Sequence, residues 1–318
     1  MRILVTGGLG YIGSHIILNL IGNGHVVYSA DNNCRSINNA KNVIENMTKV
    51  SIRNFDVDLS KEIIESKFME GVDCIIHCAG YKCVGESKQD PILYYKNNIV
   101  SALNVLEIMK KYEIKNLIFS SSCTVYGSQN NIITEKSEIG KCTNPYGWSK
   151  YMQEQIFKDI CTANKELSIC SLRYFNPIGS YNYLSDISKT NLIPAIMDVL
   201  NGKRDKLLIF GNDYDTKDGT CIRDYIHVSD LAKAHVGMLK FVSNTKGYNI
   251  FNIGSGVGYS VLDVINTFEE VNGVKIPYEF APRRDGDATI AYSNSDKISD
   301  TINWKPIYSF KEMLNLKN

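Results

Sequence analysis

The sequence predicts an α/β fold with a doubly wound parallel sheet and a second, smaller α/β lobe. Two observations in the first half support this prediction: short apolar runs alternate with helical stretches, and a glycine-rich turn follows the first apolar run. Strands that alternate with helices indicate βαβ units and therefore a parallel sheet. The third observation is a change of rhythm after Asn176, where turn-rich sequence replaces this alternation.

The patterns also place the expected elements along the chain. Continuous apolar runs, typical of strands covered by helices on both faces, lie at 3–6, 26–30, 50–55, 74–78, 117–121 and 167–174. Helical stretches lie near 12–23, 60–69, 87–111, 144–163 and 191–201. The stretch from residue 222 indicates a return to the first domain. We therefore expect one domain at 1–175 and 222–251, and a smaller lobe at 176–221 and 252–318.

Composition excludes several classes of protein. The chain has 318 residues, of which 44% are hydrophobic and 22% charged, and its formal net charge is +1. This balance is typical of a globular protein, and the near-neutral charge gives no reason to expect nucleic acid or an anionic membrane as a partner. No apolar run approaches the length of a membrane span, and a first strand at residue 3 leaves no room for a signal peptide. We expect a cytoplasmic protein.

The nine cysteines form no regular framework and are expected to be reduced thiols. Cys74, His77, Cys78 and Cys83 lie close together in the sequence, but their spacing matches no common zinc pattern. A buried strand that runs into a turn explains these residues better. No metal is expected.

The first turn has the glycine spacing of a Rossmann-type dinucleotide site. In TGGLGYIG, Gly7 allows the tight turn, Gly10 lets the backbone approach a pyrophosphate, and Gly13 lets the helix pack on the strand. The free N–H groups and the dipole of the following helix would attract the phosphates. The alternative is an ordinary strand–turn–helix with chance glycines, which the flanking strand and helix disfavour.

Asp31, at the end of the second predicted strand, indicates which dinucleotide binds. A carboxylate at this position accepts hydrogen bonds from the adenine ribose and repels a 2′-phosphate, so it favours NAD over NADP. The nearby Arg35 weakens that preference slightly. Further residues that follow the later strands could complete the cofactor site: Asp58, Leu59, Cys78, Ala79, Gly80, Lys82 and Asn97.

Ser122, Tyr146 and Lys150 predict the chemistry. Ser122 lies just past the fifth strand, where ligands sit in doubly wound sheets. Tyr146 and Lys150 are one helical turn apart and face the same way. A lysine ammonium and a nicotinamide ring would favour the phenolate, which makes Tyr146 a general base for redox chemistry at a carbinol carbon. A tyrosine and lysine at this spacing are often only a surface pair, but their place after Ser122 favours the catalytic interpretation.

Six motifs resemble the UDP-galactose 4-epimerase branch of the extended short-chain dehydrogenase/reductase family. They are GGLGYIGSH, SSSCTVYG, NPYGWSK, LRYFNPIG, IFGNDYDTKDGTCIRDYIHVSDLA and APRRDGD. The resemblance runs from residue 1 to about 305 and implies interconversion of UDP-galactose and UDP-glucose through a 4-keto sugar, with bound NAD. It further implies a homodimer through the helices near 87–111 and 144–163.

The resemblance also implies residue roles. Tyr146 would be the base and acid, Lys150 would lower its pKa and bind the nicotinamide ribose, and Ser122 would relay the proton. Contacts to NAD would add Tyr11, Ile12, Asn32 and Phe175 to the residues above. Contacts to the UDP-sugar would come from Ser122, Thr124, Tyr146, Asn176, Asn191, Leu192, Leu208, Phe210, Arg223, Arg284, Asp287 and Ala291. Arginines suit a diphosphate and a carboxylate suits a ribose hydroxyl.

One departure from the family pattern and two alternative functions remain from the sequence. Ala291 stands where relatives restricted to glucose and galactose carry a tyrosine, so we expect some activity on UDP-N-acetylgalactosamine. The first alternative is a nucleotide-sugar 4,6-dehydratase or decarboxylase, but Cys123 and Thr124 replace the acidic residue that such enzymes carry. The second is a non-catalytic NAD-binding sensor, which would not need the retained Tyr146 and Lys150.

Overall fold

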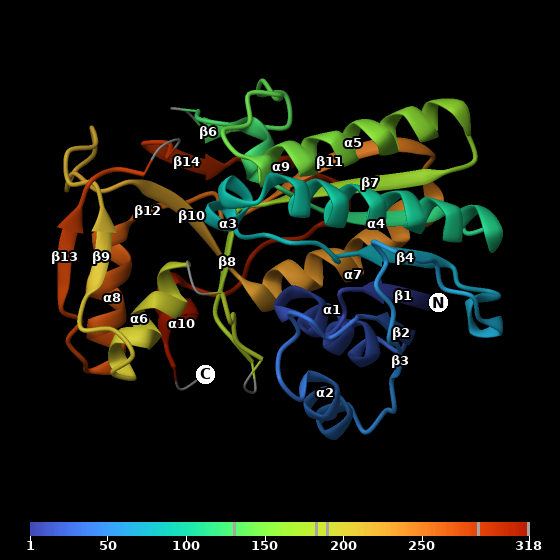
Figure 1. Ribbon diagram of the computed structural model, residues 1–318, viewed down its shortest axis with the longest axis horizontal. Coiled ribbons are helices and arrows are strands. Elements are labelled where there is room, and N and C mark those ends of the chain that lie inside the picture. The colour runs from blue at the N-terminus through green and yellow to red at the C-terminus, as the bar shows by residue number, and fades with distance from the viewer. Residues whose placement is uncertain (130–131, 182–183, 189–190, 285–286, 317–318) are drawn as a thin grey trace.

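The computed structural model describes residues 1–129, 132–181, 184–188, 191–284 and 287–316 (Figure 1). Its centre is a 7-stranded sheet in the order β11-β7-β5-β4-β1-β2-β3, and all six pairings are parallel. This sheet confirms the predicted doubly wound fold. Its strands are β1 (Arg2–Thr6), β2 (Val26–Ala30), β3 (Arg53–Phe55), β4 (Cys74–His77), β5 (Asn116–Ser122), β7 (Ser168–Tyr174) and β11 (Gly247–Ile253).

Helices cover both faces of this sheet, because alternate side chains of each strand point to opposite sides. In β1, Ile3 and Val5 join the core on one face, and Leu4 joins the core on the other. The first core includes α1 (Tyr11–Gly22), α2 (Ala40–Thr48), α7 (Val228–Asn244) and α9 (Asp296–Ile302). The second includes α4 (Pro91–Lys111) and α5 (Pro145–Ala163), which run side by side above the sheet in Figure 1.

The remaining elements form the smaller lobe at the left of Figure 1, the segments that join it to the sheet, and short helices beside the sheet itself. The small lobe has its own hydrophobic core, which lies between α6, α8, α10, β9 and β10. In chain order, all the remaining elements are η1 (Lys67–Met69), α3 (Val84–Gln89), η2 (Cys123–Tyr126), β6 (Ile132–Ile133), β8 (Asn176–Ile178), α6 (Leu192–Leu200), β9 (Leu207–Phe210), β10 (Ile222–His227), β12 (Gly258–Ser260), α8 (Val261–Asn272), β13 (Tyr278–Ala281), β14 (Ile290–Ser293) and α10 (Phe310–Leu314).

Two local expectations were wrong. The helix expected at 60–69 is a single turn after Asp58, followed by irregular chain and the short η1, and Ile64 and Met69 both pack in the core from this segment. The helix expected at 87–111 is divided at Asp90 and Pro91, where the Asp90 carboxylate caps α4 and proline ends α3. Helix α2 was not anticipated.

The chain enters the small lobe with α6 and β9, enters it again with α8 and β13, and enters it a third time with α10, after α9 has returned to the large core. After β14, α9 places Ile298 in the core beneath α7, and Trp304 follows it there. The Trp304 indole N–H donates to the Asp230 carbonyl over 3.1 Å. The expected division of the chain into two domains stays a prediction.

Buried histidines should make the protein sensitive to acid. Burial lowers the pKa of His15 and His235 to about 4 and that of His77 to about 3. An unfolded histidine takes its proton near pH 6.5, so the unfolded state binds more protons as pH falls, and stability is lost from about pH 6.5 down to 4. Between pH 7.5 and 5.5 the loss is about 1.4 kcal/mol for each such histidine. Urea midpoints against pH should fall less steeply for His15→Gln than for the wild type. Equal slopes would contradict this assignment, with the partly exposed His25→Gln as control.

Candidate active site

The glycine turn after β1 is packed too tightly for side chains. Gly7 has φ +65°, and a Cβ on it would lie 2.8 Å from the Ala79 nitrogen. A Cβ on Gly13 would lie 2.1 Å from the Gly7 carbonyl oxygen. The Gly10 N–H donates to this same carbonyl over 3.1 Å. Only glycine lets the turn, the first helix and the end of β4 approach so closely.

The N-terminus of α1 is open to an anion. Gly10 is its N-cap, no side chain among the described residues caps it, and its first turn has no acidic residue. Helix N–H groups and the helix dipole therefore face the turn without a competing carboxylate. These features fit the pyrophosphate of a dinucleotide.

Asp31 stands beside this turn, one residue after β2, and is 8% exposed. One carboxylate oxygen accepts from the Leu9 N–H over 3.0 Å, and the other accepts from the Asn33 N–H and the Ser36 hydroxyl. The carboxylate is therefore fixed in place beside the glycine turn. That position agrees with its expected role toward the adenine ribose.

The end of β4 joins the cofactor region to the catalytic region. Cys78 accepts a hydrogen bond from Ser120 over 2.9 Å, and the Ala79 N–H donates to the Thr6 hydroxyl over 3.2 Å. A Cβ on Gly80 would lie 3.8 Å from Lys150 Nζ. Cys78, Ala79 and Gly80 therefore lie between the glycine turn and Lys150.

Lys82 and Asn191, expected to bind different ligands, share one carboxylate. Lys82 Nζ lies 2.9 Å from one oxygen of Asp186, and the Asn191 amide donates to the other over 2.7 Å. Lys82 also lies 5.4 Å from the centre of the Tyr11 ring, whose hydroxyl donates to the Gly179 carbonyl over 2.5 Å. Asp186 was not anticipated, because a bridge between distant segments leaves no local pattern in the sequence.

On α4, the expected residue Asn97 is partly exposed, and its neighbour Asn98 makes the structural contacts. Asn98 is fully buried, exchanges two hydrogen bonds with the Tyr81 backbone, and donates to Ser149 over 2.9 Å. It therefore ties the loop after β4 to the helix that carries the catalytic pair. The sequence signal for this role was the position of Asn98, a polar residue one helical turn after Tyr94 on the buried face of α4.

The other expected cofactor and substrate residues are distributed around these clusters. Asp58 accepts from Ser60 and pairs with Lys61 over 2.9 Å, and Leu59 is buried against α4. The remaining positions lie at the start of a helix or in and just after strands, and they are partly or fully buried except for Leu208, which is 43% exposed. The helix positions are Ile12 and Leu192, and the others are Asn32, Phe175, Asn176 and Leu208.

Ser122 and Tyr146 meet where β5 ends. Ser122 is 8% exposed and accepts from the hydroxyl of Thr124 over 3.0 Å. Tyr146 lies on the first turn of α5, which Asn144 caps through a 2.8 Å bond to the Gly147 N–H. Burial raises the pKa of Tyr146 to about 12, and the hydrogen bond with Ser122 opposes that rise.

Lys150 is buried one turn further along α5. Its ammonium donates to the Ser120 carbonyl over 2.7 Å and lies 4.7 Å from the centre of the Phe119 ring. Burial lowers the pKa of Lys150 to about 8, whereas Cys78 and Glu154 raise it. The Lys150 ammonium is therefore hydrogen-bonded to β5. Burial, and not Lys150, has the largest effect on the pKa of the Tyr146 phenol. The hypothesis that Lys150 favours the phenolate thus requires the positive cofactor ring as well.

A cationic cluster lies in the small lobe. Asp287 stands between two arginines, 3.8 Å from Arg223 and 2.9 Å from Arg284. Arg223 also donates to the Ala288 carbonyl over 2.7 Å, and the Arg284 guanidinium lies 4.8 Å from the centre of the Phe210 ring. Two guanidinium groups beside an aromatic ring suit a nucleoside diphosphate.

Cys123 and Ala291 connect this cluster to the catalytic residues. The Cys123 thiol is close enough to Arg223 and to Tyr146 to interact electrostatically with both. Ala291 pairs with Arg223 in the sheet and packs against the same small core as Cys123. The structure therefore brings the predicted catalytic and diphosphate-binding residues to one region.

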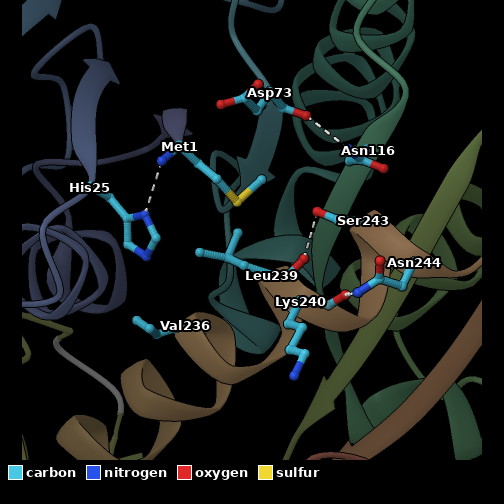
Figure 2. Close-up of a pocket in the computed structure, with 9 residues that line it drawn as sticks. All are labelled: Met1, His25, Asp73, Asn116, Val236, Leu239, Lys240, Ser243 and Asn244. Atoms are coloured by element: carbon cyan, nitrogen blue, oxygen red, sulfur yellow. Dashed lines mark hydrogen bonds between the residues drawn. The ribbon is translucent and has the colours of Figure 1, made fainter.

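One cavity lies away from this region. Its volume is about 760 Å³, and Figure 2 shows its lining residues at the amino ends of the sheet strands and the end of α7. The Asn116, Ser243 and Asn244 side chains there already donate to backbone carbonyls. A second cavity, of about 430 Å³, includes Gly211 and Arg283 in the small lobe.

Two features are absent from the described residues. No group of three or more His, Cys, Asp and Glu side chains is arranged to hold a metal ion. No described helix combines the length and the apolar character that crossing a bilayer requires.

Comparisons with known proteins agree with this geometry. The profile of the NAD dependent epimerase/dehydratase family matches residues 3–254. UDP-glucose 4-epimerase of Bacillus subtilis is 42% identical over 98% of this chain and 94% of its own. The UDP-glucose 4-epimerase of Bifidobacterium longum, solved with NAD+ and UDP, is 40% identical with a TM-score of 0.92 over 99% of this chain and 96% of its own. The UDP-Glc/GlcNAc 4-epimerase of Campylobacter jejuni is 37% identical, with a TM-score of 0.84 over 98% and 96%.

The parallel sheet, the glycine turn and the adjacent Ser122, Tyr146 and Lys150 define a dinucleotide-dependent enzyme. The chain belongs to the NAD dependent epimerase/dehydratase family. Within it, the curated relatives described above are UDP-glucose 4-epimerases, as the sequence motifs implied.

Two alanine substitutions in α1 test the glycine turn. Gly13→Ala should abolish retention of NAD and lower the thermal midpoint, because its Cβ would collide with the Gly7 carbonyl. Gly22→Ala is the matched control: nothing lies within 4 Å of its Cβ, and alanine favours a helix by about 1 kcal/mol. Nucleotide released from the denatured protein and the melting temperature measure both effects. Equal NAD content in the two variants would contradict the assigned packing.

Proposed function

We propose that this chain interconverts UDP-galactose and UDP-glucose by reversible oxidation at C4 of the sugar. The observation that carries the proposal is the meeting of Ser122 and Tyr146 beside the buried Lys150, with Arg223 close by through Cys123. NAD is the cofactor, and it binds at the glycine turn. When bound, NAD supplies the oxidant that takes a hydride from C4 and the reductant that returns it.

Tyr146 is proposed to remove and return the proton of the 4-hydroxyl. Because its phenol is buried and its pKa is raised to about 12, it is neutral in the protein alone. The Ser122 hydroxyl stabilises the phenolate by donating to it, and the Lys150 ammonium adds a positive charge on the same helical face. One residue then acts as base in the first half of the reaction and as acid in the second.

Inversion requires that the flat 4-keto sugar present its other face. We propose that Arg223, Arg284 and Asp287 hold the UDP group, since arginines pair well with a diphosphate and a carboxylate accepts from ribose hydroxyls. The sugar then makes weaker contacts than UDP and can rotate about the linking bonds. Binding energy from the distant nucleotide thereby supports a reaction that needs a loosely held sugar.

The dehydratase alternative lacks its acid in the structure. Burial raises the pKa of the Cys123 thiol to about 12, and the Thr124 hydroxyl donates to Ser122. Neither group supplies the carboxyl that elimination at C5 and C6 would use. The sensor alternative offers no role for a buried lysine next to Tyr146. Epimerisation uses each of these residues.

We further propose a cytoplasmic homodimer. Exposed apolar side chains on α4 and α5 support the expected pairing of these helices: Ile92, Leu103, Met152 and Ile160 are 65%, 44%, 38% and 36% exposed. Burial of such side chains against a second copy would be favourable. Sedimentation of the purified protein would distinguish a dimer from a monomer.

Removal of one hydroxyl tests the role of Tyr146. Tyr146→Phe should lower kcat by about 10²- to 10⁴-fold, because general acid–base catalysis is lost. The matched control is Tyr151→Phe on the same helix, whose ring packs edge-on against Trp148. Proton NMR of UDP-galactose conversion measures both. Wild-type turnover by Tyr146→Phe would sink the proposal.

Ala291 should set the size of the sugar that is accepted. Ala291 packs toward the core beside Cys123, whereas the next ring, Tyr292, lies near Gly258 on the other side of β14. A tyrosine at 291 would therefore fill space that an N-acetyl group at C2 could use. We expect Ala291→Tyr to lower kcat/KM for UDP-N-acetylgalactosamine at least about tenfold relative to UDP-galactose. Tyr292→Phe is the control, and unchanged selectivity of Ala291→Tyr would remove the argument.

A further inference from the structure

A buried ion pair lies behind the catalytic lysine. Arg173 in β7 and Glu154 in α5 are 0% and 3% exposed. Arg173 Nε and Nη2 donate to the two Glu154 carboxylate oxygens over 2.9 and 2.6 Å. The Ser121 hydroxyl donates to the first of these oxygens over 2.5 Å. None of these three residues was expected in the site.

The position of the pair links it to the site. Glu154 is one helical turn beyond Lys150 and two beyond Tyr146, so all three occupy one face of α5. Ser121 directly precedes Ser122 and pairs in register with Arg173. The ion pair therefore ties the catalytic face of α5 to the ends of both strands beneath it.

Stability alone is a weak explanation for such a pair. Removing two charges from water is costly, and well-packed apolar replacements are often as stable or more stable. One Arg173 nitrogen, Nη1, also has no hydrogen-bond partner among the described residues, so the pair is not fully satisfied. A contribution to the reaction would account for its presence.

The charge of Glu154 acts on Lys150. The groups that face the ammonium are the Ser120 carbonyl and the Phe119 ring from β5, His77 and Cys78 from β4, and Glu154 from α5. Burial lowers the pKa of His77 to about 3 and raises that of Cys78 to about 11, so both are neutral at pH 7. Of these groups, Glu154 supplies the negative charge that favours a protonated lysine.

We propose that Glu154 is a positioning residue, which through its pair with Arg173 holds α5 against β7 and keeps Lys150 in its ammonium form. This inference rests on the proposed function, because it assigns Lys150 a role in the epimerase reaction. Burial lowers the pKa of Lys150 to about 8, so a small further fall in this pKa would leave the lysine uncharged near neutral pH. Without the carboxylate, Lys150 should lose its proton at lower pH.

The test compares pH profiles of the NAD-containing enzyme. Glu154→Gln alone leaves Arg173 as an unpaired buried charge, which endangers folding. The double variant Glu154→Gln, Arg173→Met removes both charges together and avoids that penalty. Ser121→Ala is the control, because it removes one hydrogen bond to Glu154 and leaves the ion pair in place. The values of kcat and KM for UDP-galactose are measured between pH 6 and 9.

The expected result is a shift in one limb of the profile. In the double variant the alkaline decline of kcat should begin at a lower pH than in the wild type, because Glu154 raises the pKa of Lys150 and Arg173 is not among the groups that shift it. KM should change less than about twofold. Ser121→Ala should keep the wild-type limb. A kcat reduced equally at every pH, or an unshifted limb, would overturn the proposal. If the wild-type enzyme does not epimerise at all, the proposed function fails instead.

Discussion

The hydrogen bond from the Lys150 ammonium to the Ser120 carbonyl, 2.7 Å long and buried, is the contact on which the arrangement of the site depends. It fixes the first turns of α5 against the carboxyl end of β5. Tyr146, one turn before Lys150, then meets Ser122 at the end of that strand. Because the glycine turn of β1 packs directly on the residues after β4, the cofactor region adjoins the same place. Parallel strands thus bring segments far apart in sequence to one edge of the sheet.

A buried carboxylate holds the small lobe to this edge of the large sheet. Asp224 in β10 accepts from the N–H groups of Ser255, Gly256 and Ser293 over 2.7 to 3.1 Å, and from both serine hydroxyls. These bonds fix β14 beside β10. Arg223, the neighbour of Asp224, and Ala291, which pairs with Arg223, are therefore held in a fixed position relative to the catalytic residues. A rigid frame of β10 and β14 that presents the small Ala291 side chain suits a sugar that must rotate during the reaction.

Local patterns predicted the sheet, the glycine turn and the Tyr146–Lys150 face of α5, because each depends on residues within a few positions. What the patterns missed depended on distant partners. Residues 60–69 have a helical pattern, but in the structure Ile64 and Met69 both pack in the core without a helix between them. The contacts of Asn98 were not anticipated, since which asparagine of α4 is buried depends on how the helix sits on the loop after β4. The ion pair of Glu154 with Arg173 joins a helix to a strand, and no spacing in the sequence announces it.

The central claim is that the hydride removed from C4 returns to the same carbon from the opposite face. UDP-galactose carrying deuterium at C4 tests it most directly, because a carbon-bound hydride held inside the enzyme does not exchange with water. Mass spectrometry and proton NMR of the UDP-glucose formed in ordinary water should find the deuterium still at C4. A product that has lost its label to water would contradict the account, since it would indicate removal of C4 hydrogen as a proton.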